Sequence, residues 1–147
     1  MLKALKGKTL ATAESCTGGG IGAALTAVPG ASKVFVGGVI SYTNDIKNRV
    51  LGVDNAVLEK YGAVSSPVAG AMASGVRNLM KCDVAVSVTG LAGPGGDDFG
   101  NPVGTVCIGY ADKRQTLAKK FRFYGDRDDI RQQAIRAALE LILEVAQ

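Results

Sequence analysis

Apolar residues are grouped along the chain in a way that predicts alternating strands and helices. Short apolar or alternating runs bounded by glycine, proline or polar residues predict β-strands. These runs occupy residues 8–13, 34–42, 84–89, 103–111 and 115–123. Segments that begin at glycines or at a capping side chain predict helices. These segments occupy residues 18–25, 44–51, 55–61 and 66–80, followed by a last helix that begins after Asp126.

Capping residues set the expected limits of the helices. Asn44 is the expected N-cap of the helix that Gly52 closes. Ser66 is the expected N-cap of a longer helix, with Pro67 at the first helical position. Asp126 is the expected cap of the last helix. The apolar stripe of that helix consists of Ile130, Ala134, Ala138, Leu141 and Val145.

The order of these elements predicts the fold class. The run at 34–42 is apolar and rich in β-branched residues, so it predicts a central strand. Two late strands joined at Asp112 and Lys113 predict a β-hairpin. Helices that alternate with strands predict an α/β protein, here a three-layer α/β/α sandwich around a mixed β-sheet. The length of 147 residues predicts one domain over residues 1–147.

Composition excludes several kinds of catalysis. The chain contains no histidine, so it has no Ser-His-Asp triad, no Cys-His pair and no zinc bound by histidine. Cys16, Cys82 and Cys107 are odd in number and far apart, which favours neither a disulfide framework nor a C-x-x-C metal site. A catalytic base must therefore be Lys, Asp, Glu, Tyr or Cys.

Charge and hydropathy limit the partners. The net charge of +4 is spread without a dense basic arm, and aromatic residues make up 5% of the chain, so nucleic-acid binding is not expected. Binding of a small anionic ligand needs far less positive charge than binding of a nucleic acid, so a small anion is still an open alternative. No apolar stretch approaches the ~20 residues of a membrane helix. The polar opening of the chain favours a cytoplasmic location.

The segment AESCTGGG at 13–20 is the first candidate for chemistry. A strand ends, Ser15 and Cys16 follow, and glycines open a helix. A nucleophile placed there would lie close to the free N–H groups of a helix N-terminus. The alternative is that Ser15 or Thr17 only caps the helix. Cys16 is the rival nucleophile.

A lysine follows the next strand and is the natural partner for a serine in a chain without histidine. Lys47 lies five residues after Tyr42, in a predicted helix. It can act as a base only if its pKa falls from about 10.4 to about 7–8, which burial can achieve. The alternatives are a solvated helix lysine and a tyrosine at the rim of a site.

Two further segments have a composition that suits an anion. TGLAGPGG at 89–96 follows a buried strand and begins a 13-residue loop, from Gly90 to Pro102, which is either a nest of N–H groups or a mobile turn. Arg127 and Arg131 lie one turn apart at the start of the last helix. They can bind a phosphate or carboxylate, or pair with neighbouring aspartates.

Together these segments resemble the C-terminal domain family of the competence/damage-inducible protein CinA, which includes stand-alone nicotinamide-nucleotide amidases (PncC). The resemblance covers the chain from about residue 10 onward. It is carried by AESCTGG (13–19), VPGAS (28–32), F-x-G-G-V-I-S-Y-x-N-x-x-K (35–47), GAVS (62–65), TGLAGPGG (89–96), NPVGTV (101–106) and GDRDxIR (125–131).

The resemblance implies an enzyme that hydrolyses the carboxamide of nicotinamide mononucleotide to nicotinate mononucleotide and ammonia, in pyridine-nucleotide recycling. It implies a serine nucleophile at Ser15 that acts with Lys47 and Tyr42, no metal or organic cofactor, and a homo-oligomer. Substrate contacts are expected from the glycine-rich segments and the arginine pair: Thr17, Gly18, Gly19, Thr89, Gly90, Gly93, Gly95, Gly96, Arg127 and Arg131. The alternatives are a non-catalytic nucleotide-binding or regulatory module and a Ser-Lys amidase for another small amide.

Overall fold

A five-stranded mixed sheet forms the centre of the molecule in the computed structural model, which describes residues 3–5 and 7–146. The strands are β1 (Leu10–Glu14), β2 (Phe35–Ile40), β3 (Val84–Gly90), β4 (Thr105–Ala111) and β5 (Thr116–Arg122). They lie in the order β2-β1-β3-β4-β5. The first three are parallel, and β4 and β5 are antiparallel to their neighbours.

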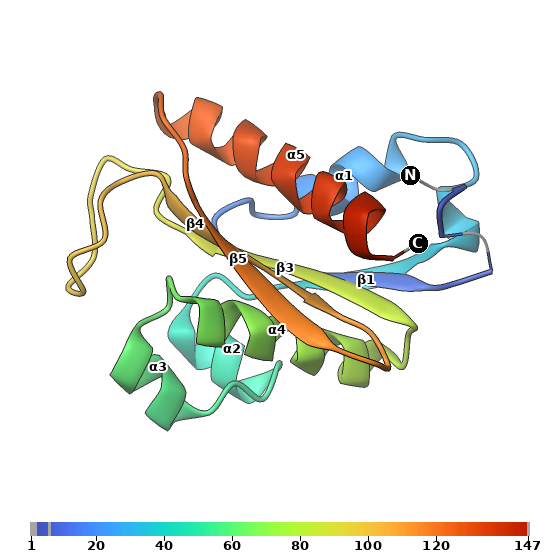
Figure 1. Cartoon of the computed structure of the whole chain (residues 1–147), viewed down its shortest axis with the longest axis horizontal. Coiled ribbons are helices and arrows are strands. Elements are labelled where there is room, and N and C mark those ends of the chain that lie inside the picture. The colour runs from blue at the N-terminus through green and yellow to red at the C-terminus, as the bar shows by residue number, and fades with distance from the viewer. Residues whose placement is uncertain (1–2, 6, 147) are drawn as a thin grey trace.

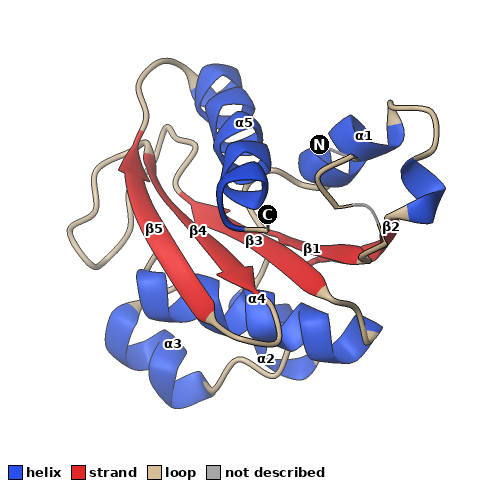
Figure 2. Cartoon of the chain, turned by 45° about the vertical axis from the view of Figure 1, so that its right-hand side comes forward, coloured by secondary structure: helices blue, strands red, loops and turns tan. Residues whose placement is uncertain are grey.

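Helices cover both faces of this sheet, which confirms the predicted three-layer α/β/α class. Figures 1 and 2 show one layer on one side of the sheet and a second layer on the other. The first layer consists of α1 (Gly20–Thr26) and α5 (Arg127–Val145). The second consists of α2 (Asn44–Arg49), α3 (Asn55–Tyr61) and α4 (Ser66–Met80). A short 3-10 turn at Ala31–Lys33 leads into β2.

The core is divided between the two faces of the sheet. Under α1 and α5, apolar side chains of β3 and β4 such as Val86 and Ile108 pack against Ile21 and Ile142. On the other face, Met72 and further apolar residues of α4 pack against the small residues of β1 and β3. Small strand residues let α4 lie close to the sheet, so the carboxyl ends of the strands are held at fixed positions.

The strand at 34–42 is an edge strand, so the prediction of a central strand was wrong. β2 pairs with β1 and has no described partner on its other side. Its residues alternate between partly buried and exposed, with Val36 48% and Ile40 58% exposed. The run is apolar on both faces, but only one of the two is covered by packing.

Two predicted caps are shifted by one residue. The N-cap of α2 is Thr43, whose hydroxyl accepts the Ile46 N–H at 3.3 Å, and not Asn44. The N-cap of α4 is Ser65 rather than Ser66, so Pro67 stands at the second helical position. Asp126 is confirmed as the cap of α5, where it forms a capping box with Asp129.

The predicted apolar stripe of α5 is confirmed. Ile130, Ala134, Ala138 and Leu141 are buried, and Val145 is partly buried and packs against the same core. Ile142, which the prediction did not include, is fully buried as well. No helix in the described part of the chain is long and apolar enough to cross a membrane.

Candidate active site

The segments that follow the three parallel strands meet at one edge of the sheet. Ser15 and Cys16 follow β1, Tyr42 follows β2, and β3 ends at Gly90. This is the edge at which open α/β sheets bind their ligands. A cavity of about 420 Å³ opens there. It is lined by Ser15, Cys16, Tyr42, Asn44, Lys47, Ala63, Val64, Thr89, Gly90, Leu91, Ala92, Gly93, Gly95, Gly96, Asp97, Asp98, Phe99 and Arg127.

Lys47 and Ser15 are in direct contact at the floor of this cavity. The Lys47 Nζ lies 3.1 Å from the Ser15 Oγ, and both side chains are buried. The same amine donates to the backbone carbonyls of Ser41 at 2.9 Å and Tyr42 at 3.4 Å. The amine also donates to the Ser15 Oγ, and the Ser15 hydroxyl donates to the Tyr42 carbonyl at 3.5 Å. When Lys47 is neutral, two N–H bonds can stay on the two carbonyls, and its lone pair is then free to accept the Ser15 hydroxyl proton.

Burial lowers the pKa of Lys47 from 10.5 to about 8, because desolvation disfavours the ammonium form. No carboxylate forms an ion pair with this lysine in the described part of the chain. With this pKa roughly a tenth of the lysines are neutral at pH 7. Lys47 is thus a buried amine with a lowered pKa, and the alternative of a solvated helix lysine is wrong.

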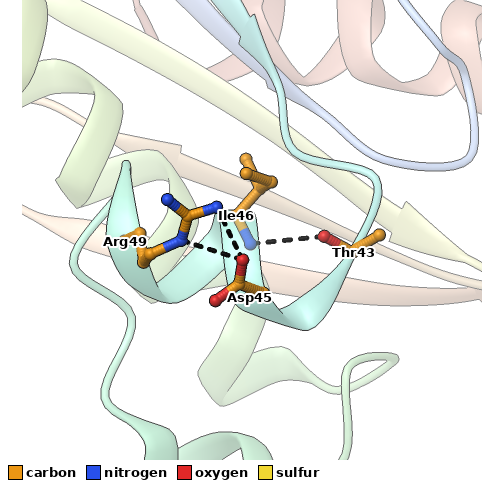
Figure 3. A network of polar contacts seen from close by, with 4 residues as sticks. All are labelled: Thr43, Asp45, Ile46 and Arg49. Atoms are coloured by element: carbon orange, nitrogen blue, oxygen red, sulfur yellow. Dashed lines mark hydrogen bonds and ion pairs between the residues drawn. The ribbon is translucent and has the colours of Figure 1, made fainter.

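The short helix α2 holds Lys47 in place. Its first turn is capped by Thr43, and Arg49 pairs with Asp45 at 2.7 Å on its exposed side (Figure 3). Such exposed pairs contribute only a few tenths of a kcal/mol each. The cap and the pair order the helix from the solvent side, while Lys47 points into the protein.

Glu14 caps α1, and Ser15 and Thr17 do not. The N-cap position is Gly19, which has no side chain to contribute. The buried Glu14 carboxylate accepts the N–H groups of Ile21 at 2.7 Å and Gly22 at 3.1 Å, and the Thr17 hydroxyl at 2.7 Å. The capping alternative for Ser15 is therefore wrong, and its hydroxyl instead accepts from Lys47 and donates to the Tyr42 carbonyl.

Sequence reasoning missed this role of Glu14. The signal was available, because a carboxylate at the end of a strand, directly before a helix N-terminus, satisfies orphan N–H groups. It follows that the start of α1 is already occupied by a protein anion. The turn that carries Ser15 is therefore held by the hydrogen bonds of the buried Glu14 carboxylate.

Cys16 lines the cavity but is a poor rival nucleophile. Its side chain is 6% exposed, and burial raises the pKa of its thiol to about 11, despite the opposing charges of Arg131, Lys47 and Arg127. A thiol with this pKa is protonated at neutral pH and is weakly nucleophilic. Ser15, whose Oγ is in contact with the Lys47 amine, is the better candidate.

Tyr42 contributes two different groups to the site. Its carbonyl accepts from Lys47, whereas its hydroxyl accepts from the Arg127 Nη2 at 3.2 Å. The other terminal nitrogen of Arg127 donates to the Gly93 carbonyl at 2.5 Å. Arg127 therefore joins the glycine-rich loop to Tyr42, and the phenol is directed to the arginine rather than to Lys47.

Arg131 and three predicted contact residues lie outside the cavity lining. Arg131 donates to the carbonyls of Cys16 and Thr17, both at 3.1 Å. Thr17, Gly18 and Gly19 form the turn between Ser15 and α1 and do not line the cavity. Arg131 thus supports the turn that follows Ser15, whereas Arg127 faces the cavity.

The glycine-rich loop brings four predicted glycines and several unpredicted residues to the cavity. Gly90, Gly93, Gly95 and Gly96 line it, and the Thr89 hydroxyl anchors the start of the loop by donating to the Ala63 carbonyl at 2.9 Å. In the described part of the chain, the N–H groups of Gly93, Gly95 and Gly96 have no hydrogen-bond acceptor. These free donors favour an anion-binding nest over a mobile turn.

The unpredicted lining residues include Asn44, Asp97, Asp98 and Phe99. Asp97 orders the far end of the loop, since it accepts the N–H groups of Phe99 at 3.1 Å and Asn101 at 3.0 Å. The spacing of an aspartate two and four residues before these N–H groups was a readable turn signal. Among the described residues, no group of three or more Cys, Asp or Glu side chains could hold a metal ion.

The fold and this site define a known class. A model of the CinA C-terminal domain matches residues 1–146, and the chain belongs to that family. It is 48% identical over 136 residues to a CinA-like protein of Synechococcus sp. (strain CC9902), covering 91% of this chain and 32% of the relative. It is 47% identical over 137 residues to a putative competence-damage inducible protein of Caldanaerobacter subterraneus, covering 93% and 33%. The chain thus spans about a third of the length of these relatives.

Solved structures of family members share the whole fold. The competence/damage inducible protein CihA of Agrobacterium tumefaciens is 41% identical, with a TM-score of 0.91 over 97% of this chain and 87% of that one. The competence damage-inducible protein A of Klebsiella pneumoniae is 36% identical, with a TM-score of 0.94 over 98% and 89%.

Proposed function

We propose that this chain is an amidohydrolase that deamidates nicotinamide mononucleotide to nicotinate mononucleotide and ammonia. The observation that carries the proposal is the 3.1 Å contact between the Lys47 Nζ and the Ser15 Oγ, combined with the lowered pKa of that lysine. A nucleophile with a buried, partly neutral amine as its base is suited to acyl transfer. The choice of substrate follows the family resemblance of the motifs.

In the first half of the reaction, Lys47 takes the Ser15 hydroxyl proton as Ser15 Oγ attacks the carboxamide carbon. The resulting ammonium of Lys47 keeps its two contacts to the Ser41 and Tyr42 carbonyls. It then returns the proton to the amide nitrogen as the C–N bond breaks. Ammonia leaves, and the nicotinoyl group remains as an ester on Ser15.

In the second half, Lys47 takes a proton from water as the water oxygen attacks the ester carbon. The C–O bond to Ser15 breaks, and the proton on Lys47 restores the serine hydroxyl. One amide and one water thus give one carboxylic acid and one ammonia. Acid–base catalysis of this type contributes about 10²–10⁴ in rate.

The oxyanion is stabilised by the glycine-rich loop rather than by the start of α1. The N–H groups of Gly18 and Gly20 already donate to the Ser15 and Thr17 carbonyls, and those of Ile21 and Gly22 donate to Glu14. The Gly19 N–H has no described acceptor, but Gly19 does not line the cavity. The loop at 90–96 keeps free donors beside the cavity. One oxyanion donor contributes about 10²–10³ in rate.

Arg127 provides the positive charge for the substrate phosphate. Its guanidinium lines the cavity, and its present acceptors are a neutral carbonyl and a neutral phenol, which a phosphate can replace with stronger bonds. Tyr42 then acts as a rim residue that orients Arg127, while its carbonyl orients Lys47.

The three cysteines are free thiols, which supports a reducing compartment such as the cytoplasm.

The test is ammonia release from nicotinamide mononucleotide by the unmodified chain, Ser15→Ala and Lys47→Met. Release by the first alone supports the amidase and its pair. Retention of most activity by Ser15→Ala would remove Ser15 from the mechanism. Binding of the nucleotide without release by any of the three would favour a binding module, and no binding would favour an amidase for another small amide.

A further inference from the structure

A second hollow, of about 630 Å³, lies at the end of the sheet opposite to Ser15. Its charged lining consists of Lys8, Arg77, Asp83, Asp112, Lys113 and Arg114. Asp83 precedes β3, whereas Gly90 at the other end of this seven-residue strand lines the catalytic cavity. At about 3.3 Å per residue the two hollows are roughly 20 Å apart. Figure 1 shows the β4–β5 turn at the right-hand end of the sheet and the long loop after β3 at the left-hand end.

The two carboxylates in this hollow are already engaged by their own neighbours. Asp83 accepts the N–H group and the hydroxyl of Thr9, at 2.8 and 3.0 Å. Asp112 accepts the N–H groups of Arg114 and Gln115, at 2.8 and 2.9 Å, and the buried Tyr110 hydroxyl at 2.9 Å. Both aspartates therefore serve as acceptors for the β-sheet ends and the β4–β5 turn.

The four cationic side chains of the hollow are Lys8, Arg77, Lys113 and Arg114, and unlike its two carboxylates they have few partners among the described residues. None of the four forms an ion pair with a described carboxylate. Lys8 donates to the Ala146 carbonyl at 3.0 Å, and the Arg77 Nε donates to the Asp83 carbonyl at 3.0 Å. The terminal nitrogens of Arg77 and the side chains of Lys113 and Arg114 have no hydrogen-bond acceptor among the described residues. Four cations against two carboxylates leave an excess positive charge.

We propose that this hollow is a second ligand site, which binds a small phosphate-bearing anion. A phosphate group presents two negative charges and several acceptor oxygens, which match the free guanidinium and ammonium donors. Arg77 comes from α4 and is held by its Nε contact, so its fork is oriented in advance. Lys113 and Arg114 approach from the β4–β5 turn on the other side. The volume is in the range that holds a pyrophosphate or a nucleotide.

The test is a titration with inorganic pyrophosphate, followed by the backbone amide NMR signals of the whole chain. Binding in the second hollow shifts the amides of Thr9, Val84 and Arg114 at lower ligand concentration than those of Gly90 to Gly96. The double variant Lys113→Gln/Arg114→Gln is expected to weaken this binding at least tenfold. Both side chains are exposed in a turn, so the fold tolerates the change. The matched control is Lys33→Gln/Lys60→Gln, which removes the same charge from exposed positions elsewhere.

Each remaining outcome overturns the proposal. Shifts confined to residues 90–96 would assign the ligand to the catalytic cavity alone. Equal weakening by the control variant would show attraction by net charge without a site. A single-stranded oligonucleotide that binds more tightly than pyrophosphate, and is lost in Lys113→Gln/Arg114→Gln, would replace the small anion with a nucleic acid.

Discussion

Two glycine-rich segments follow neighbouring strands of the sheet, and the structure uses them differently. The first, at 18–20, follows β1 and lies outside the cavity lining; its Gly18 and Gly20 N–H groups donate to nearby carbonyls, and only the Gly19 N–H has no described acceptor. The second, at 90–96, follows β3, and three of its glycines keep free N–H groups beside the cavity. The difference comes from a buried carboxylate, Glu14, which occupies the helix start next to the first segment. Glycine content alone does not locate a ligand site, because what decides it is whether the N–H groups already have acceptors.

This comparison predicts that changes behind the first segment alter kcat and stability, whereas changes at the second alter substrate binding. The first segment and Glu14 fix the turn that carries the proposed nucleophile, Ser15. The second segment and Arg127 face the cavity. The predictions below test that division.

The largest effect is expected from pH, through the base that acts on Ser15. Burial lowers the pKa of Lys47 to about 8, and only the neutral amine can take the serine proton. We therefore expect kcat/KM to rise about tenfold per pH unit below 8 and to level off above it, a gain of roughly 100-fold from pH 6 to the plateau. A pH–rate profile of ammonia release measures this. A flat profile from pH 6 to 9 would contradict the assigned base.

The next largest effect is expected from Glu14→Gln. The amide keeps one acceptor oxygen, but its NH₂ group meets an N–H donor of Ile21 or Gly22, so one buried donor loses its partner. We expect a loss of about 1–3 kcal/mol in the free energy of unfolding and a roughly tenfold lower kcat. Urea denaturation and steady-state kinetics measure both. Glu59→Gln, at an exposed helix position, is the matched control. An unchanged kcat in Glu14→Gln would separate the helix cap from catalysis.

Arg127→Gln and Arg131→Gln form a matched pair with opposite expectations. Arg127 faces the cavity, so its loss is expected to raise KM roughly tenfold with little change in stability. Arg131 holds the Cys16 and Thr17 carbonyls, so its loss is expected to lower stability by about 1–2 kcal/mol with a smaller change in KM. Kinetics and thermal unfolding of both variants decide this. The reverse pattern would move the phosphate site to Arg131.

The smallest effects are expected from alanine in place of single glycines. Gly19 has φ of +102°, so Gly19→Ala is expected to cost about 1–2 kcal/mol of stability. A Cβ at Gly95 meets nothing within 4 Å, so Gly95→Ala is expected to stay within about 0.5 kcal/mol. Denaturant midpoints of the two variants provide the comparison. Equal losses would show that both segments are held with the same rigidity.

The fold was largely predictable from the sequence, because the strand runs and the turn residues mark most elements within two residues. The position of β2 was not predictable in this way, since its apolar face and its exposed face have similar composition. An edge position is a property of the strand order, which pairs β1 with β3 across more than 70 residues of chain. Local patterns contain little information about such pairing.

The sequence predicted the proposed reacting pair, Ser15 and Lys47, but it did not predict the residues that hold the turn around Ser15. The absence of histidine directed attention to Lys47 and Ser15, which the structure brings together. The roles of Glu14 and Arg131 depend on which backbone groups they reach, and a one-dimensional pattern does not show this. Ser15 and Lys47 are proposed as the reacting pair, and Tyr42, which the sequence placed with them, is proposed as a positioning residue at the rim.

The contact between Arg131 and the Cys16 carbonyl also has a consequence for the order in which the candidate site forms during folding. These residues are 115 positions apart, so the turn behind Ser15 is completed only when α5 has been made and has docked. Closure of long loops of this kind slows folding. Before α5 docks, Ser15 and Lys47 are therefore present without the support that Arg131 gives to the turn between them and α1. The candidate site is expected to become ordered only in the last step of folding, when α5 packs on the sheet.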